Sequence, residues 1–243
     1  MRYLIRFSYE GSNFYGFQKQ PDLRTVEEEL EKALFSINNH TNTKVVGSGR
    51  TDRGVHARGQ SVHFDLTIDI TLEKLKKALN SLLPEDIHVF STEVVDKDFH
   101  ARYMAKQKTY EYILNTGEYD PITRNHIYQL NKKLNLDLMT EAIEYFKGTH
   151  DFKSFVSNET IKDNYVRTIY EAEIRQEKDL VIFSFTGSGF MKYQVRNMVG
   201  TLIKIGLGKL DPSIVDEIFT DSDKKKYVYT AKSQGLYLVD VKY

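Results

Sequence analysis

Residues 2–9, "RYLIRFSY", are the stretch from which the fold is inferred. Large apolar side chains occupy every second position from Tyr3 to Tyr9, while Leu4 and Arg6 fall on the opposite face. This period of two is typical of a β-strand with one buried face. Glycine, asparagine and proline in the next residues, 10–24, predict a loop.

Two amphipathic helices are predicted downstream of this strand. The first begins at Thr25, where Glu28 completes a capping box, and runs to about Asn38. The second begins at Thr71 and is ended by Pro84. Their apolar stripes are Leu30, Leu34 and Ile37 in the first, and Leu72, Leu75, Leu79, Leu82 and Leu83 in the second.

Short strands are predicted around these helices at residues 43–46, 60–66 and 86–95. The resulting order is β-α-β-β-α-β, which is typical of a ferredoxin-like domain. The second half repeats the mixture of elements after a basic connector, residues 100–108. Strands are predicted at 109–114, 166–176, 180–187 and 235–243, and helices at about 136–147, from Gly189 to Ile205, and shortly after Asp211.

Composition narrows the class of protein. The 243 residues, with 40% hydrophobic and 28% charged residues, are typical of a folded globular chain with two domains. No apolar run approaches the length of a membrane span and the amino-terminal residues do not resemble a signal sequence, so we expect a cytoplasmic protein. The absence of cysteine excludes disulfides, thiol nucleophiles and cysteine-ligated zinc.

The net charge is formally zero, which counts mildly against a nucleic-acid-binding protein, but the charges are segregated. Aromatic residues are abundant, and exposed rings on a sheet would favour RNA binding, although most rings in folded proteins fill cores. The basic residues collect at Arg50, Arg53 and Arg58, at Arg102, Lys106 and Lys108, and at Lys192 and Arg196.

The first of these basic groups lies in "GSGRTDRGVHARGQ", residues 47–60. The glycine spacing matches neither a phosphate-binding loop nor a dinucleotide fingerprint. His56 and His63 do not have a recognised metal-ligand spacing, and no serine-hydrolase elbow is present. Asp52 therefore remains as the candidate reactive group.

Arginines on both sides of Asp52 favour its ionised form. An ionised carboxylate can attack a carbon centre or stabilise positive charge developing on a sugar. A salt bridge within a surface loop explains the same residues equally well. Neither reading is excluded by charge alone.

Four separated stretches resemble motifs of the TruA family of tRNA pseudouridine synthases, in the family's order. They are "YEGSNFYGFQKQ" at 9–20, "GRTDRGVHARGQSVHF" at 49–64, "KTYEYILN" at 108–115 and "GSGFMKYQVRNMVG" at 187–200, and "GTHDFKSF" at 148–155 is similar to a further segment. The resemblance implies isomerisation of uridine to pseudouridine at positions 38, 39 and 40 in the anticodon stem-loop of tRNA. It implies no metal and no organic cofactor.

The resemblance also assigns residues. It implies that Asp52 is the catalytic carboxylate, that Tyr110 stacks on the target base, and that Arg196 pairs with the carboxylate. Arg50 is expected to hold the displaced nucleotide. An unpaired cation in the apolar helix that contains Arg196 would be costly, which independently favours a carboxylate partner.

The remaining residues of the stretch are candidates for contact with RNA. They are Arg53, Arg58, His56 and Gln60, although hydrogen bonding within the protein is the more common role for the last two. Arg53 and Phe17 stand where the family commonly has alanine and tryptophan, and Glu10 replaces its frequent aspartate. Arg53 is therefore expected to add a phosphate contact or to alter which tRNAs are preferred.

The fold implied by the family is α+β, with two ferredoxin-like domains, residues 1–105 and 106–243, joined antiparallel sheets and a basic cleft. A homodimer is implied as well. The competing hypotheses are a non-catalytic RNA-binding protein, which would tolerate loss of the Asp52 carboxylate, and a glycosidase. The glycosidase requires a second carboxylate near Asp52, and the motif offers none.

Overall fold

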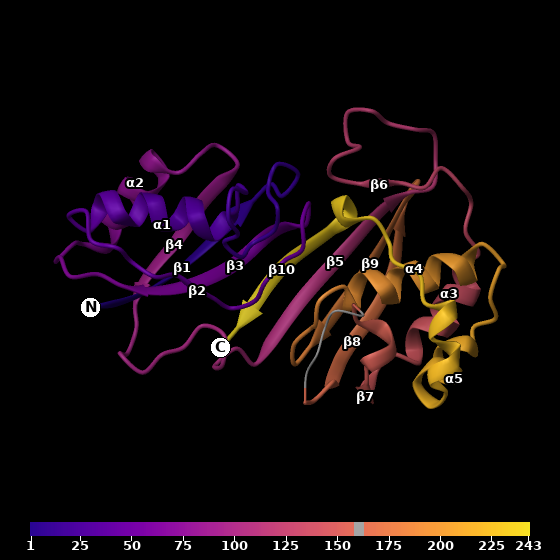
Figure 1. Ribbon diagram of the computed structural model, residues 1–243. Coiled ribbons are helices and arrows are strands. Elements are labelled where there is room, and N and C mark those ends of the chain that lie inside the picture. The colour runs from indigo at the N-terminus through magenta and orange to yellow at the C-terminus, as the bar shows by residue number, and fades with distance from the viewer. Residues whose placement is uncertain (158–162) are drawn as a thin grey trace. The chain divides into compact units, whose positions relative to one another are not determined.

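The computed structural model describes residues 1–157 and 163–243, which form two compact units (Figure 1). Unit 1 comprises Met1–Lys106 and Leu238–Tyr243, and unit 2 comprises Gln107–Tyr237. The predicted second domain ran to residue 243, whereas the C-terminal segment lies with unit 1. Helices combine with mostly antiparallel strands in both units, so the fold class is mixed α+β.

Unit 1 contains the predicted β-α-β-β-α-β order and one additional strand from the end of the chain. Strand β1 is paired on both sides and is antiparallel to β3 and to β4. The hydrogen-bonded order is β4-β1-β3-β10, and β2 also pairs with β3. The elements are β1 (Arg2–Tyr9), α1 (Val26–Ile37), β2 (Val46–Gly47), β3 (His56–Asp65), α2 (Leu72–Leu82), β4 (Ile87–Val94) and β10 (Leu236–Lys242).

Strand β1 forms the centre of the core of unit 1, as its alternation predicts. Tyr3, Ile5 and Phe7 are fully buried, and helices α1 and α2 lie on one side of the strands (Figure 1). Leu4 is also buried, on the opposite face, where it stands directly across from His63 of β3. Both faces of β1 are therefore partly covered.

Three local predictions in unit 1 are wrong. Thr25 precedes α1 but makes no capping hydrogen bond, and its hydroxyl is buried without a hydrogen-bond partner. Leu72 and Leu82 are exposed, because α2 buries the narrower stripe of Leu75 and Leu79. Strand β3 begins at residue 56 rather than 60, so the end of the basic stretch is strand and not loop.

Unit 2 contains a second sheet, in the order β5-β9-β8-β7, with β6 parallel to β5. Helix α3 packs against α4 and β8. No helix in the described part of the chain is long and apolar enough to cross a membrane. The elements are β5 (Gln107–Asn115), β6 (Tyr128–Gln129), α3 (Leu136–Glu144), β7 (Gly148–Asp151), β8 (Val166–Glu177), β9 (Leu180–Gly187), α4 (Gln194–Gly206) and α5 (Ile214–Thr220), with 3-10 helices at Lys153–Phe155, Ser222–Tyr227 and Ser233–Gly235.

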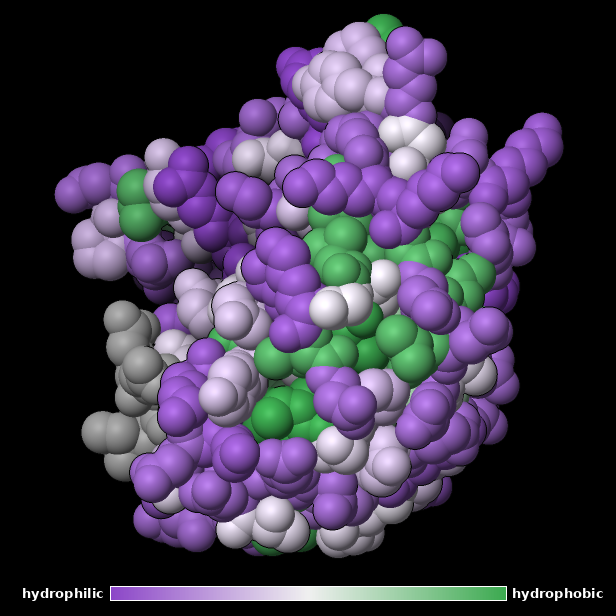
Figure 2. All heavy atoms as spheres, turned by 90° about the vertical axis from the view of Figure 1, so that its right-hand side faces the viewer, coloured by the Kyte–Doolittle hydropathy of each residue, from purple (hydrophilic) through white to green (hydrophobic). Residues whose placement is uncertain are grey.

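Aromatic side chains form much of the core of unit 2. Phe146, Phe152 and Phe155 are fully buried, and the rings of Phe146 and Phe155 lie edge to face with centroids 5.1 Å apart. Figure 2 shows the side of the molecule on which α3 and α5 lie, where hydrophobic surface gathers amid hydrophilic side chains. These phenylalanine rings thus serve packing.

Helix α4 begins later than predicted, at Gln194 rather than near Gly189. Tyr193, which precedes it, has a φ of +65°, a left-handed conformation that is unusual for a residue with a side chain. This conformation cannot continue into the preceding residues as a helix, so they form the turn from β9 into α4. Helical periodicity alone does not reveal such a break.

The connector after β4 packs against His63 of β3. The ring of His63 lies edge to face with those of Phe99 and His100, at centroid distances of 6.2 and 5.0 Å. Its Nδ1 accepts a hydrogen bond from the Ala101 backbone N–H at 3.1 Å. Burial lowers the pKa of His63 from 6.5 to about 4, and the charges of Arg2 and His100 add to this effect.

Unit 1 should therefore lose stability as acid protonates the unfolded chain. Between pH 6.5 and about 4 the unfolded state binds a proton at His63 that the folded state does not. This contribution is fully present above pH 6.5 and is lost as the pH falls through that range, lowering the free energy of unfolding by about 2 kcal/mol. Urea denaturation across the range measures it.

The matched control is His63→Asn, in which the amide oxygen can accept the Ala101 hydrogen bond but cannot titrate. Carboxylates titrate equally in both proteins, so the variant should show a weaker pH dependence. Equal pH dependence in the two proteins would contradict the role assigned to His63.

Candidate functional site

Asp52 lies on a tight turn between β2 and β3 in unit 1. The Val55 backbone N–H donates to the Asp52 carbonyl at 3.2 Å, and Gly54 has a φ of +75°, which favours glycine. The flanking Thr51 is buried, while Asp52 is half-buried. The turn therefore fixes the backbone at a residue that is neither fully buried nor fully exposed.

A second loop, residues 10–24, packs directly against this turn. The Phe17 backbone N–H donates to the Thr51 carbonyl at 3.1 Å, and the Gly54 N–H donates to the Phe14 carbonyl at 3.3 Å. Gly16 has a φ of +98°, and a Cβ there would lie 2.9 Å from the Thr51 carbonyl oxygen. A side chain at residue 16 would thus separate the two loops.

Buried polar side chains form hydrogen bonds with the residues that precede Asp52. The Tyr9 hydroxyl and the Thr51 hydroxyl are hydrogen-bonded at 2.8 Å, and burial raises the pKa of Tyr9 to about 12. Gln60 is fully buried; its side chain accepts from the Ser48 hydroxyl at 2.6 Å and donates to the Gly49 carbonyl at 3.2 Å. The neutral Tyr9 and Gln60 therefore anchor the residues on the amino-terminal side of Asp52.

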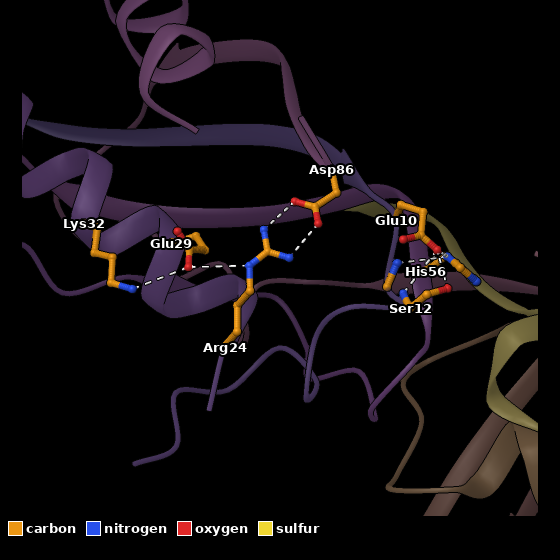
Figure 3. Close-up of polar contacts among 8 residues, drawn as sticks. Glu10, Ser12, Arg24, Glu29, Lys32, His56 and Asp86 are labelled. Atoms are coloured by element: carbon orange, nitrogen blue, oxygen red, sulfur yellow. Dashed lines mark hydrogen bonds and ion pairs between the residues drawn. The ribbon is translucent and has the colours of Figure 1, made fainter. Parts of the chain in front are cut away.

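His56 joins the second loop to the start of β3 (Figure 3). Its Nδ1 accepts from the Gly11 backbone N–H at 2.9 Å and lies 3.5 Å from a Glu10 carboxylate oxygen. The same Glu10 oxygen accepts hydrogen bonds from the backbone N–H and the hydroxyl of Ser12. Because His56 is only 1% exposed, it is a support beneath the loops.

Arg24 fixes the far end of the second loop (Figure 3). Its guanidinium donates to both carboxylate oxygens of Asp86, at 2.7 and 2.8 Å, and its Nε lies 3.8 Å from Glu29. The same guanidinium lies 4.2 Å from the centroid of the Phe14 ring. Glu29 is also 3.5 Å from Lys32. The bidentate pair defines both the distance and the orientation of the loop relative to β4.

The three arginines of the basic stretch have exposed side chains. They are Arg50, Arg53 and Arg58. The Arg53 guanidinium carbon lies 4.2 Å from the centroid of the Tyr15 ring, which is itself 38% exposed. Positive charge therefore lies at the surface around the Asp52 turn, and the second loop orients part of it.

Unit 2 contributes the two remaining candidates, Tyr110 on β5 and Arg196 on α4. Tyr110 is 7% exposed, and its ring meets that of Phe190 edge to face at 5.1 Å. The Arg196 Nε donates to the Ala231 carbonyl at 2.9 Å, and its guanidinium lies 4.6 Å from the centroid of the Tyr193 ring. Both side chains are thus oriented within their own unit.

The basic stretch brings most of the predicted site residues together in unit 1, with its arginines exposed and with His56 and Gln60 buried. Tyr110 and Arg196 belong to unit 2. Sequence reasoning missed the supporting role of Tyr9 and Gly16. The alternation of β1 predicts only that Tyr9 is buried in the core. The glycine at residue 16 predicts a turn, but not that this turn packs against Thr51.

This arrangement suits a carboxylate that reacts in cationic surroundings. The backbone of the Asp52 turn is held by hydrogen bonds from two directions, and surface arginines supply charge that attracts a polyanion. Such rigidity keeps a reacting group in place while a large substrate approaches. A negatively charged substrate is the class that this surface favours.

Comparison with known proteins identifies relatives along the whole chain. A family model described as tRNA pseudouridine synthase matches residues 5–104 and 142–243. A tRNA pseudouridine synthase A of Streptococcus mutans is 44% identical over 246 aligned residues, covering 100% of this chain and 99% of the relative. One of Streptococcus pyogenes is 45% identical with the same coverage.

Replacing Gln60 by methionine tests the anchoring of the Asp52 turn. Methionine keeps the length of the side chain but leaves the buried Ser48 hydroxyl and the Gly49 carbonyl without this partner. The free energy of unfolding should fall by about 2 kcal/mol, measured by urea denaturation. The same change at the exposed Gln18 is the control and should alter stability far less. Equal effects at both positions would contradict the anchoring role.

Proposed function

This chain belongs to the tRNA pseudouridine synthase family, and on that premise we propose that it converts uridine to pseudouridine in tRNA, using the Asp52 carboxylate. The single observation that carries the proposal is the held turn of Asp52, whose backbone is fixed while the residue is only half-buried. Because Asp52 is not fully buried, it can contact a nucleotide without a rearrangement of the core.

The reaction exchanges one bond to the ribose for another. The bond between uracil N1 and ribose C1′ breaks, the base turns, and a bond forms between C5 and C1′. The proton on C5 leaves and N1 gains one, so the overall change is an isomerisation. We infer that Asp52 starts this sequence, acting on the sugar or on the base as it detaches, since an ionised carboxylate serves either role.

Tyr110 and Arg196 are proposed to act on the same nucleotide as Asp52. A nucleotide that leaves its stem loses stacking and pairing, and contacts with the protein must replace them. Tyr110 offers a ring for stacking, and its placement in a motif of the family supports a role in removing the C5 proton. The guanidinium of Arg196, oriented by Tyr193 and the Ala231 carbonyl, is proposed as the charge partner of the Asp52 carboxylate.

The residues of the basic stretch divide by exposure. We propose that Arg50 holds the displaced nucleotide and that Arg53 and Arg58 contact phosphates, because all three side chains are exposed. For His56 and Gln60, the two alternatives are contact with RNA and orientation of the loop. Their burial favours orientation.

On the family resemblance we further propose that the protein acts at positions 38, 39 and 40 of the anticodon stem-loop and forms a homodimer. We also propose catalysis without metal or organic cofactor, and a cytoplasmic location with the tRNA. The order β4-β1-β3-β2 within unit 1 supports a ferredoxin-like description of that unit. A ferredoxin-like second domain, joined sheets and a basic cleft are proposed on the family resemblance.

Replacing Asp52 by asparagine should abolish pseudouridine formation. The amide cannot act as an anion, so turnover on unmodified tRNA should fall by at least about a thousandfold while RNA binding persists. Mapping pseudouridine after incubation with each protein measures this. Asp69→Asn removes an exposed carboxylate elsewhere in unit 1 and should leave turnover unchanged. If the wild-type protein modifies nothing, or Asp52→Asn retains full activity, a non-catalytic RNA-binding protein becomes the better description.

Binding of tRNA should weaken steeply as salt increases, despite the zero net charge of the chain. Phosphate contacts release counterions, so the logarithm of affinity falls linearly with the logarithm of salt concentration. Arg53→Ala should reduce that slope by about one, measured by filter binding over a salt series. Lys44→Ala, at an exposed position, is the control for loss of one positive charge. An affinity independent of salt would contradict this prediction.

A further inference from the structure

Cationic and aromatic side chains gather on helix α4 and on residues 226–229, away from the residue proposed for catalysis. Lys204 lies on α4, Lys226 and Tyr227 end the 3-10 helix Ser222–Tyr227, and Tyr229 follows that helix. The proposed function uses only Arg196 of α4. We call the other side chains of this group the α4 strip and define it by four residues, which are Lys204, Lys226, Tyr227 and Tyr229.

The segment that carries the strip is fastened to α4 by its backbone. The Ala231 N–H donates to the Arg196 carbonyl at 2.9 Å, and the Tyr229 N–H donates to the Thr201 hydroxyl at 3.4 Å. A Cβ on Gly200 would lie 2.0 Å from the Tyr229 carbonyl oxygen, so only glycine allows this approach. The segment therefore follows the helix as a fixed feature, beside α4 in Figure 1.

Each aromatic ring of the α4 strip is paired with a lysine. The Lys204 Nζ lies 4.5 Å from the centroid of the Tyr229 ring, and the Lys226 Nζ lies 5.3 Å from that of Tyr227. Tyr229 is 38% exposed. The neighbouring Lys224 is held by Glu217 at 2.9 Å, so it is not counted in the strip.

The position of the strip separates it from the reacting nucleotide. A helix advances ~1.5 Å per residue, so Lys204 lies roughly 12 Å along α4 from Arg196. A group bound at Lys204 therefore belongs to a different nucleotide from the one that Arg196 serves.

We propose that the α4 strip binds a second segment of the substrate tRNA, with its lysines on phosphates and its tyrosine rings against unpaired bases. This proposal rests on the proposed function and specifies how the same RNA is held away from Asp52. Rings beside cations favour RNA over a protein partner, because bases stack on aromatic faces while the phosphates take the charge. An acidic protein surface would form ion pairs with the lysines but would have no bases to stack on the tyrosine rings.

The test separates binding from chemistry. In the variant Lys204→Ala with Tyr229→Leu, KM for tRNA should rise about tenfold while kcat is unchanged, because stacking and charge are lost without touching the reacting atoms. Lys77→Ala with Tyr119→Leu removes an exposed lysine and an exposed tyrosine elsewhere and should leave both constants unchanged. Lys204→Arg should retain the low KM. An unchanged KM in the first variant would overturn the proposal.

A second measurement uses the wild-type protein, so it does not depend on a variant that folds. tRNA carrying 4-thiouridine is irradiated in complex with the protein, and cross-linked peptides are identified by mass spectrometry. Cross-links at Tyr227 or Tyr229 support the proposal, and their absence when other sites cross-link overturns it. If tRNA cross-links at the strip but is not modified, the proposed function fails while the binding surface stands. Displacement of the RNA by an acidic protein at the strip would favour a protein partner.

Discussion

The contact between two loops is the constraint on which the candidate site depends. The Phe17 N–H meets the Thr51 carbonyl at 3.1 Å only because Gly16 has no side chain to hold the loops apart. Arg24 fixes one end of this contact through Asp86, and the buried Tyr9 supports it from the sheet. The backbone of the Asp52 turn is thus positioned by residues other than the proposed catalytic group.

Much of the fold is predictable from local patterns. The alternation of residues 2–9 predicts the central strand of unit 1, and the two leucine-rich stretches predict its helices. Two details of the helices differ from these patterns. The stripe of α2 is narrower than its leucines suggest because only one side of the helix meets the sheet, and α4 starts late because Tyr193 adopts a left-handed backbone.

The sequence predicts the candidate carboxylate of the site but not the residues that support it. A carboxylate among arginines and glycines indicates reactivity, and the motifs give it a family. The sequence does not show that Gln60 lies beneath the turn or that His56 binds the Gly11 backbone, because each contact joins residues from different elements. Likewise, the sequence does not show that Tyr229 lies against α4 with its ring beside Lys204.

The return of residues 238–243 to unit 1 affects how the protein is made. Strand β10 supplies the partner of β3, and Tyr243 is hydrogen-bonded to Ser61 at 2.7 Å. During synthesis these residues leave the ribosome after the whole of unit 2. Unit 1, which carries Asp52, is therefore translated almost entirely before β10. The edge of β3 that pairs with β10 stays unpaired while unit 2 is synthesised. The strand that completes the unit carrying Asp52 is therefore synthesised after the whole of unit 2.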